Sequence, residues 1–102
     1  MDPLEFEAEL WLWDARRADT WTFLSVPPEL SEEIRDRAAT LPPAGFGSVR
    51  VAVTIGSTTW QTSVFAGAGR YDLPVKRSVR RAEGLETGDR VRVRLEIVGE
   101  SS

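Results

Sequence analysis

The chain of 102 residues contains no cysteine and no histidine. The absence of cysteine excludes disulfides, thiolate nucleophiles and cysteine-bound zinc. The absence of histidine removes the commonest general base and the commonest transition-metal ligand. Carboxylates, hydroxyls, lysine, arginine and a single tyrosine remain for any chemistry. We therefore expect no catalytic residues, no metal and no cofactor, with a histidine-free enzyme as an alternative.

Long apolar runs and an excess of positive charge are also missing. The N-terminal segment from Met1 to Glu5 lacks the basic start and the apolar run of a secretory signal. The apolar stretches are far shorter than the about 20 residues of a membrane-spanning helix. The net charge is −3, which predicts no general attraction to nucleic acid or to an anionic membrane. We expect a cytoplasmic protein with no membrane partner, for which nucleic acid is a disfavoured ligand.

Apolar residues make up 41% of the chain, which is enough to build one hydrophobic core. We expect a single domain over residues 1–102, with a core over residues 4–98 and a polar tail over residues 99–102.

Apolar and polar residues alternate with period two in several segments, which is typical of half-buried strands. In residues 4–13 we expect the apolar set to point inward, namely Phe6, Ala8, Leu10 and Leu12. Further strands are predicted over residues 21–26, 49–55, 58–66, 70–73 and 90–97. In the last of them the inward residues are expected to be Val91, Val93, Leu95 and Ile97. Gly56-Ser57 is a hairpin signal between two of them, and Pro74 is expected to end the shortest one.

Two segments show helical spacing of apolar residues. The first covers residues 29–40, and Ser31 is expected to cap its start. The second covers residues 75–83, and Gly84 suits its C-terminal cap. Because tight turns join most of the strands, we expect an antiparallel sheet. The predicted fold is mostly β, a small closed or split antiparallel β-barrel capped by these two short α-helices.

Several segments of the chain resemble one known family. The most specific is GRYDLPVKRSVRRAEGL at residues 69–85, and it is followed by GDRVRVRL at residues 88–95. Similar pieces fall at residues 21–23, 47–51 and 60–64. Over residues 4–98 the chain resembles the family called domain of unknown function 1905. The resemblance implies a double-split β-barrel capped by helices, and it implies no settled activity.

Two further properties come with this resemblance. Some family members carry an additional helical domain linked to bacteriocin protection, for which we expect no room in this chain. Related barrels occur in DNA-binding antitoxin and transition-state-regulator domains, which is an analogy of fold and not of function.

Basic residues gather in the family-like segment. Five cations lie against one acid, Asp72, and they are Arg70, Lys76, Arg77, Arg80 and Arg81. On a helix, cations four residues apart repel each other by a few tenths of a kcal/mol. An anion site would offset that repulsion. The plainer alternative, commoner for a run of charges, is pairing with Glu5, Glu7, Glu9 and Glu83 or simple solvation.

Six residues are the candidates for a ligand pocket at one mouth of the barrel, because small-ligand pockets mix polar and aromatic linings. They are Arg70, Tyr71, Lys76, Arg80, Trp60 and Ser63. The expected ligand is an anionic small molecule or a protein partner. The alternatives are that Trp60 packs in the core or rim and that Tyr71 bonds a backbone group. An enzyme without histidine would use Lys76, Arg80, Tyr71 and Ser63.

Four tryptophans form a second candidate surface, namely Trp11, Trp13, Trp21 and Trp60. Trp11 and Trp13 lie on the strand face opposite Phe6 and Leu10. Exposed rings could stack on nucleic-acid bases or form a homodimer interface, so the protein is expected to be a monomer or a homodimer. A small dimeric nucleic-acid-binding barrel is the alternative function. The favoured alternative to exposure is that the helix over residues 29–40 covers these rings.

Overall fold

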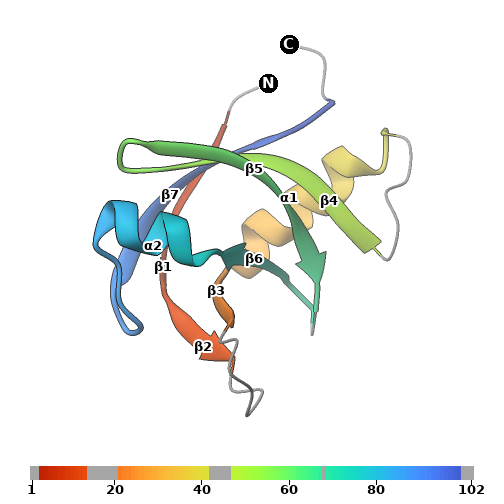
Figure 1. The fold of residues 1–102 in the computed structure, drawn as a ribbon. Helices are drawn as coiled ribbons and strands as arrows, with labels where there is room; N and C mark the ends of the chain where they lie inside the picture. The colour runs from red at the N-terminus through yellow and green to blue at the C-terminus, as the bar shows by residue number, and fades with distance from the viewer. Residues whose placement is uncertain (1–2, 14–20, 42–46, 68, 100–102) are drawn as a thin grey trace.

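The computed structural model describes residues 3–13, 21–41, 47–67 and 69–99 of the chain. The turn expected at residues 14–19 and part of the loop at residues 45–47 lie outside the described residues. The elements are β1 (Leu4–Glu9), β2 (Trp11–Trp13), β3 (Trp21–Ser25), α1 (Pro28–Ala38), β4 (Ser48–Ile55), β5 (Thr58–Ala66), β6 (Tyr71–Val75), α2 (Arg77–Glu83) and β7 (Arg90–Ile97) (Figure 1). None of the helices in these ranges is long and apolar enough to cross a membrane.

The seven strands form one antiparallel sheet in the order β1-β7-β4-β5-β6-β3-β2. The sheet curves into a half-barrel (Figure 1). Its end strands, β1 and β2, are consecutive in the chain, yet no pairing between described strands joins them. The prediction of a mostly β, antiparallel fold is confirmed, whereas its closed form is not supported because the two sheet ends do not pair.

The segment predicted as one strand over residues 4–13 is divided at Leu10. β1 pairs with β7, while β2 pairs with β3 at the other end of the sheet. Between them, the Leu10 N–H donates a hydrogen bond to the carbonyl of Asp89, the residue just before β7, at 2.9 Å. Leu10 is fully buried, but Leu12 is 44% exposed. The prediction that Leu12 points inward is therefore wrong, because the alternation does not continue across a change of partner strand.

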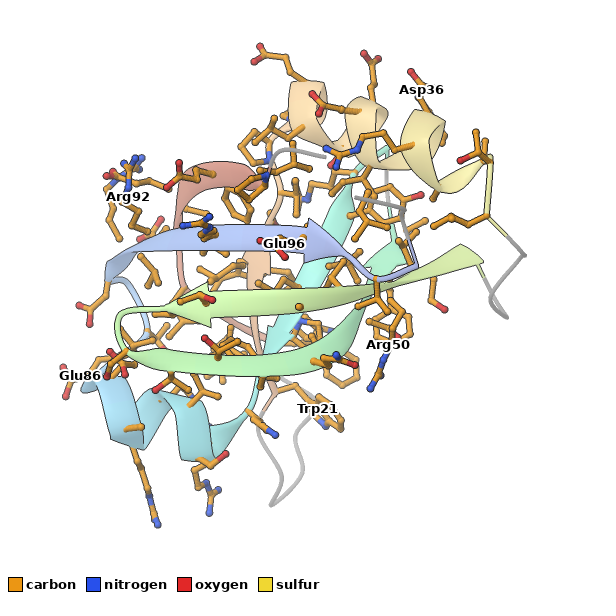
Figure 2. The ribbon with its side chains drawn as sticks, turned by 90° about the horizontal axis from the view of Figure 1, so that it is seen from above. Trp21, Asp36, Arg50, Glu86, Arg92 and Glu96 are labelled. Carbon is orange, nitrogen blue, oxygen red and sulfur yellow. The ribbon has the colours of Figure 1, made fainter. Side chains whose placement is uncertain are left out.

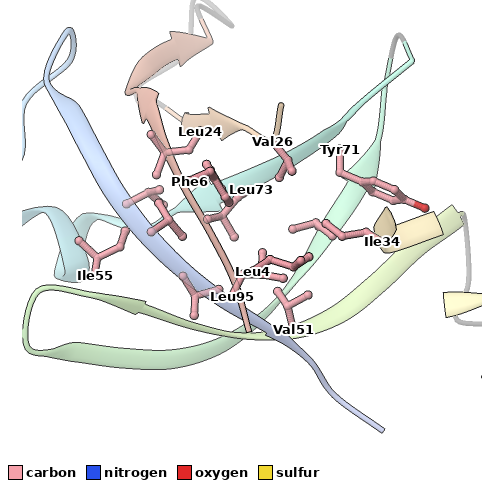
Figure 3. Close-up of a cluster of buried hydrophobic side chains, with 14 of the residues drawn as sticks. Leu4, Phe6, Leu24, Val26, Ile34, Val51, Ile55, Tyr71, Leu73 and Leu95 are labelled. Atoms are coloured by element: carbon pink, nitrogen blue, oxygen red, sulfur yellow. The ribbon is translucent and has the colours of Figure 1, made fainter. Parts of the chain in front are cut away.

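The buried side chains gather on the inner face of the half-barrel (Figure 3). In β7, the four predicted inward residues are buried, namely Val91, Val93, Leu95 and Ile97. Ile34 of α1 and Val79 of α2 join the same cluster. Each fully buried aliphatic side chain of this kind stabilises the fold by about 1.5–3 kcal/mol. The strand pattern over residues 90–97 is therefore confirmed in bounds and in orientation.

α1 begins earlier than its predicted cap. Pro27 occupies the N-cap position without a side-chain hydrogen bond, and Pro28 suits the first turn. Ser31 lies inside the helix and is buried, so the prediction that it caps α1 is wrong. Its hydroxyl instead donates to the Val26 carbonyl at 3.1 Å and accepts from the Tyr71 N–H at 3.0 Å. Ser31 thus joins the helix to the ends of β3 and β6.

α2 is two residues shorter than predicted, because Val75 still belongs to β6 and pairs with Thr22. Pro74 was expected to end that strand but lies within it, opposite Phe23. Proline is tolerated where a strand has an open edge, and β6 has lost its β5 partner at this point. Gly84 adopts φ 66° at the C-cap, which confirms the predicted helix end.

Candidate functional site

A groove lies where β5 and β6 separate. The two strands pair only through Phe65 with Asp72 and Ala66 with Tyr71. Farther along, β5 stays with β4 while β6 stays with β3. The groove has a volume of about 490 Å³, within the range of about 300–1,000 Å³ of small-molecule sites. It is lined by residues 60–62 of β5, Pro74 and Val75 of β6, Trp21 and Thr22 of β3, and Lys76, Arg77 and Arg80.

One wall of this groove is cationic. Lys76 directly follows β6, Arg77 begins α2, and Arg80 comes one turn later. The four-residue spacing brings Lys76 and Arg80 to the same helix face. Within the described ranges, no carboxylate lies at ion-pair distance from any of the three. The groove therefore carries positive charge that the described part of the protein leaves uncompensated.

Arg80 is the most constrained of these cations. Its side chain is partly buried, and its Nε is the one buried side-chain nitrogen or oxygen without a hydrogen-bond partner among the described residues. More than about 90% of buried polar groups in proteins have a partner, and leaving one unsatisfied costs about 1–3 kcal/mol. An acceptor atom in the groove would remove that cost.

The glutamates expected to neutralise the basic segment are engaged elsewhere. Glu7 lies 3.6 Å from both Arg90 and Arg92 of β7. Glu83 accepts hydrogen bonds from Ser57 and Thr58 of the β4–β5 hairpin. The predicted pairing of Glu7 and Glu83 with the basic segment is therefore wrong, whereas the other alternative, simple solvation of that segment, stays a prediction. Glu7 faces β7 because β1 borders β7 at one end of the sheet whereas α2 follows β6, and Glu83 is bonded to the hairpin.

The remaining walls of the groove mix apolar and uncharged polar side chains, and they are firmly placed. Trp60 is half-buried and lies opposite buried Val53, so its side chain belongs to the inner face of the sheet. Thr22 forms part of the floor, and its hydroxyl donates to the Val75 carbonyl at 2.7 Å. Glu83 holds α2 against the hairpin. These contacts fix the strand end and the helix from which Lys76 and Arg80 extend.

The structure divides the six residues predicted for one pocket. Trp60, Lys76 and Arg80 line the groove together. Arg70 and Tyr71 instead border a separate cavity of about 80 Å³ beside α1. Arg70 pairs with Asp72 at 3.3 Å, and Tyr71 is buried in the core cluster. A single mouth lined by all six residues is therefore not what the fold forms.

Ser63 and Trp21 show opposite failures of the sequence reasoning. Ser63 lies opposite exposed Arg50, on the outer face, and does not line the groove. The sequence spacing could have excluded Ser63. It lies three residues after Trp60 on the same strand, and side chains an odd number of residues apart point to opposite faces. Trp21 lines the groove from β3, and no sequence signal links β3 to this site.

An aromatic surface adjoins the groove, formed by Trp11, Trp13, Trp21, Phe23 and Phe65 around a depression of about 390 Å³. Trp11 stacks on Phe23 with ring centroids 5.1 Å apart, and Trp21 stacks on the same ring at 6.5 Å. Trp13 and Trp21 are 52% and 54% exposed. Trp21 reaches this outer edge in Figure 2.

α1 does not cover this aromatic surface. Its buried residue Ile34 points into the core beside Tyr71 and Val51 (Figure 3), and none of its residues borders the aromatic depression. The prediction that the first helix covers Trp11 and Trp13 is therefore wrong. The helix packs on the inner face of the sheet, whereas these two rings leave from the outer face.

Among the described residues, no group of three or more carboxylates is placed to hold a metal ion. The groove instead offers nitrogen donors and aromatic walls, which suit an anion or a flat apolar group. Comparison with curated proteins gives no match. Comparison with protein families matches residues 6–95 to the family described as Domain of unknown function (DUF1905). Because that match covers most of the 102 residues, the chain belongs to the DUF1905 family.

Proposed function

We propose that the protein is a non-enzymatic binding module that holds an anionic group in the groove between β5 and β6. The group belongs to a small molecule or to a protein partner. The observation that carries this proposal is the buried Nε of Arg80, which has no partner among the described residues. A phosphate or carboxylate oxygen at that point would form a charge-assisted hydrogen bond, which is shorter and stronger than a neutral one.

The surroundings of Arg80 favour this assignment. Lys76 and Arg77 line the same groove and add two positive charges. Trp60 and Val75 supply apolar walls, which exclude water and strengthen electrostatic interactions inside the site. Lys76 contributes as a flexible point charge, whereas the guanidinium of Arg80 presents donors in a fixed geometry. The groove thus combines one oriented donor set with more adaptable charge.

The architecture in this proposal is a split barrel whose ends are capped by the two helices. α1 contributes Ile34 to the core, and α2 contributes Val79. In Figure 2 the two helices lie at opposite ends of the view, with α1 at the top and α2 at the bottom. With α2 as one cap, the groove forms the passage between that cap and the sheet. We place this binding module in the cytoplasm, in keeping with the sequence expectation.

Inorganic pyrophosphate is a suitable probe, and calorimetric titration measures its dissociation constant. Arg80→Met keeps the apolar stem of the side chain and removes the donor. We expect it to weaken pyrophosphate binding by about 10- to 100-fold, because hydrogen bonds to charged groups contribute about 1.5–3 kcal/mol. Arg81→Met removes the same charge from an exposed position of α2 that does not line the groove.

The control variant decides between a site and a general charge effect. We expect Arg81→Met to change the dissociation constant by less than about threefold, because exposed charges are strongly screened. Equal losses in both variants would mean that pyrophosphate responds only to net charge. Absence of binding to the unmodified protein would contradict the proposal outright. Melting curves of each variant establish that the fold is intact.

A further inference from the structure

The groove and the aromatic surface are continuous. Trp21 and Pro74 border both depressions, so the two share an edge. On the groove side lie Lys76, Arg77 and Arg80, which have no ion-pair partner among the described residues, and on the other side lies the row of stacked rings. A ligand held at Arg80 therefore meets Trp21 at the boundary of its own site.

Trp21 is suited to receive a flat group. Phe23 supports it through a near-parallel stack, with an interplanar angle of 16°, and Trp11 supports Phe23 in turn. Trp21 nevertheless remains 54% exposed. A ring held by neighbouring rings loses little conformational freedom when another ring stacks on it. Base–aromatic stacking of this kind tolerates any flat heterocycle, because each presents a π-face.

The size of the aromatic surface argues against a second copy of the chain as its main occupant. Fully buried aromatic side chains bury about 150–250 Å² each. Trp13, Trp21 and Phe65 are 52%, 54% and 46% exposed, so together they offer about 300 Å². A stable protein interface needs about 800 Å² from each partner. The exposed aromatic area is too small for a dimer on its own, but it is ample for one ring system.

We propose that the anionic ligand also carries a flat heteroaromatic ring, as a mononucleotide does, and that this ring stacks on Trp21 while the phosphate lies at Arg80. This inference rests on the proposed function. It favours a small molecule over a nucleic-acid strand for two reasons. The three cations of the groove converge on one cavity, and the net charge of −3 opposes binding of a long polyanion.

The test compares three probes by calorimetry, namely inorganic pyrophosphate, ADP and adenosine. ADP joins a diphosphate to a flat ring, while each of the other probes carries one part alone. We expect ADP to bind about tenfold more tightly than pyrophosphate, from the stacking contribution of one base. Adenosine is expected to bind more weakly than ADP, and stacking should quench tryptophan fluorescence on ADP addition.

Two matched variants test whether the ring of ADP stacks on Trp21. Trp21→Ala should remove the tenfold advantage of ADP, so that ADP and pyrophosphate bind this variant with similar affinities. Trp13→Ala removes a ring of nearly equal exposure, 52% against 54%, that does not line the groove. It should leave both affinities unchanged. Both rings are largely exposed, so melting curves of the variants should stay close to that of the unmodified protein.

The outcomes separate this inference from the proposed function. If pyrophosphate binds through Arg80 but ADP binds no more tightly, the ring inference is overturned and the anion site stands. If neither probe binds, both proposals fail. Loss of the ADP advantage in Trp13→Ala instead of Trp21→Ala would also overturn the inference. So would tighter, steeply salt-dependent binding of a single-stranded oligonucleotide, which would point to a strand as the ligand.

Discussion

The outer face of the β1–β7 ladder and the surface around α2 differ in whether their charged side chains face partners of opposite charge. Along β1 and β7, glutamates face arginines in register, with Glu5 opposite Arg94 and Glu9 opposite Arg90. Glu7 lies between two arginines at 3.6 Å from each. Around α2, the cations have no ion-pair partner among the described residues. Figure 2 shows Arg92 on the first of these surfaces and Trp21 near the second.

The difference indicates which charges are structural and which are available. The charges of the β1–β7 ladder face charges of opposite sign, so a structural role accounts for them. The N-cap and first turns of α2 instead place Lys76 and Arg80, and Arg77 and Arg81, four residues apart without a side-chain cap. Like charges at this spacing are mildly destabilising. Positions that break local rules without compensation tend to be functional. The comparison therefore directs attention to the groove beside α2.

The substitution with the largest expected effect disturbs the hydrogen bonds of Glu83 that hold α2 against the β4–β5 hairpin. Gly56 adopts φ 58°, and a Cβ at this position would overlap the Glu83 carboxylate that braces α2. We expect Gly56→Ala to lower the free energy of unfolding by about 2 kcal/mol, from left-handed strain and the clash, and to weaken pyrophosphate binding. Urea unfolding measures the first effect and calorimetry the second.

Gly69→Ala is the matched control for this change. Gly69 adopts φ 79° but has open space around it, so its substitution brings the backbone strain without the clash. We expect a smaller loss of about 1 kcal/mol and no change in pyrophosphate affinity. Equal losses of stability and affinity in the two variants would show that Glu83 does not position α2.

The next prediction compares one arginine from each surface, because replacing them should change the free energy of unfolding in different directions. Arg80→Met removes the buried Nε, which has no partner in the described part of the chain, and we expect the free energy of unfolding to rise by about 1 kcal/mol. That rise corresponds to a melting temperature higher by about 4–8 °C in a domain of this size. Arg92→Met on the paired surface should instead leave stability unchanged or slightly lower. Thermal unfolding measures both, and destabilisation by Arg80→Met would mean that the guanidinium already has a structural partner.

The smallest effect concerns the paired surface itself. Glu7→Gln removes the carboxylate shared by Arg90 and Arg92. Because these groups are exposed, we expect a loss of only about 0.2–1 kcal/mol. The loss should disappear near 1 M salt, where the screening length is about 3 Å. A loss that persists at high salt would contradict a purely electrostatic role for this ladder.

Local patterns predicted much of the fold. The strands over residues 58–66 and 90–97 match β5 and β7 in their bounds, because their alternation and flanking turns act over short distances. The break at Leu10 could not be predicted in this way, since it depends on which strands pair at the two ends of the sheet. Ser31 was misassigned for a similar reason, because its partner Tyr71 lies 40 residues away.

The residues of the candidate site were predicted in part. Trp60, Lys76 and Arg80 come together in the groove, and two of them share a helix face that the spacing already indicated. Trp21 reaches the groove because β3 pairs with β6, where Thr22 lies opposite Val75. That pairing joins segments about fifty residues apart, and no local signal reports it. Sequence thus located the charged wall of the groove but not its aromatic end.

The most direct test of the account observes the Nε–H group of Arg80 itself. Its nuclear magnetic resonance signal can be assigned by its loss in Arg80→Met, and inorganic pyrophosphate can then be titrated into the unmodified protein. We expect the Arg80 signal to shift in a saturable way while that of Arg81 stays in place. An Arg80 signal that does not move while pyrophosphate binds elsewhere would contradict it.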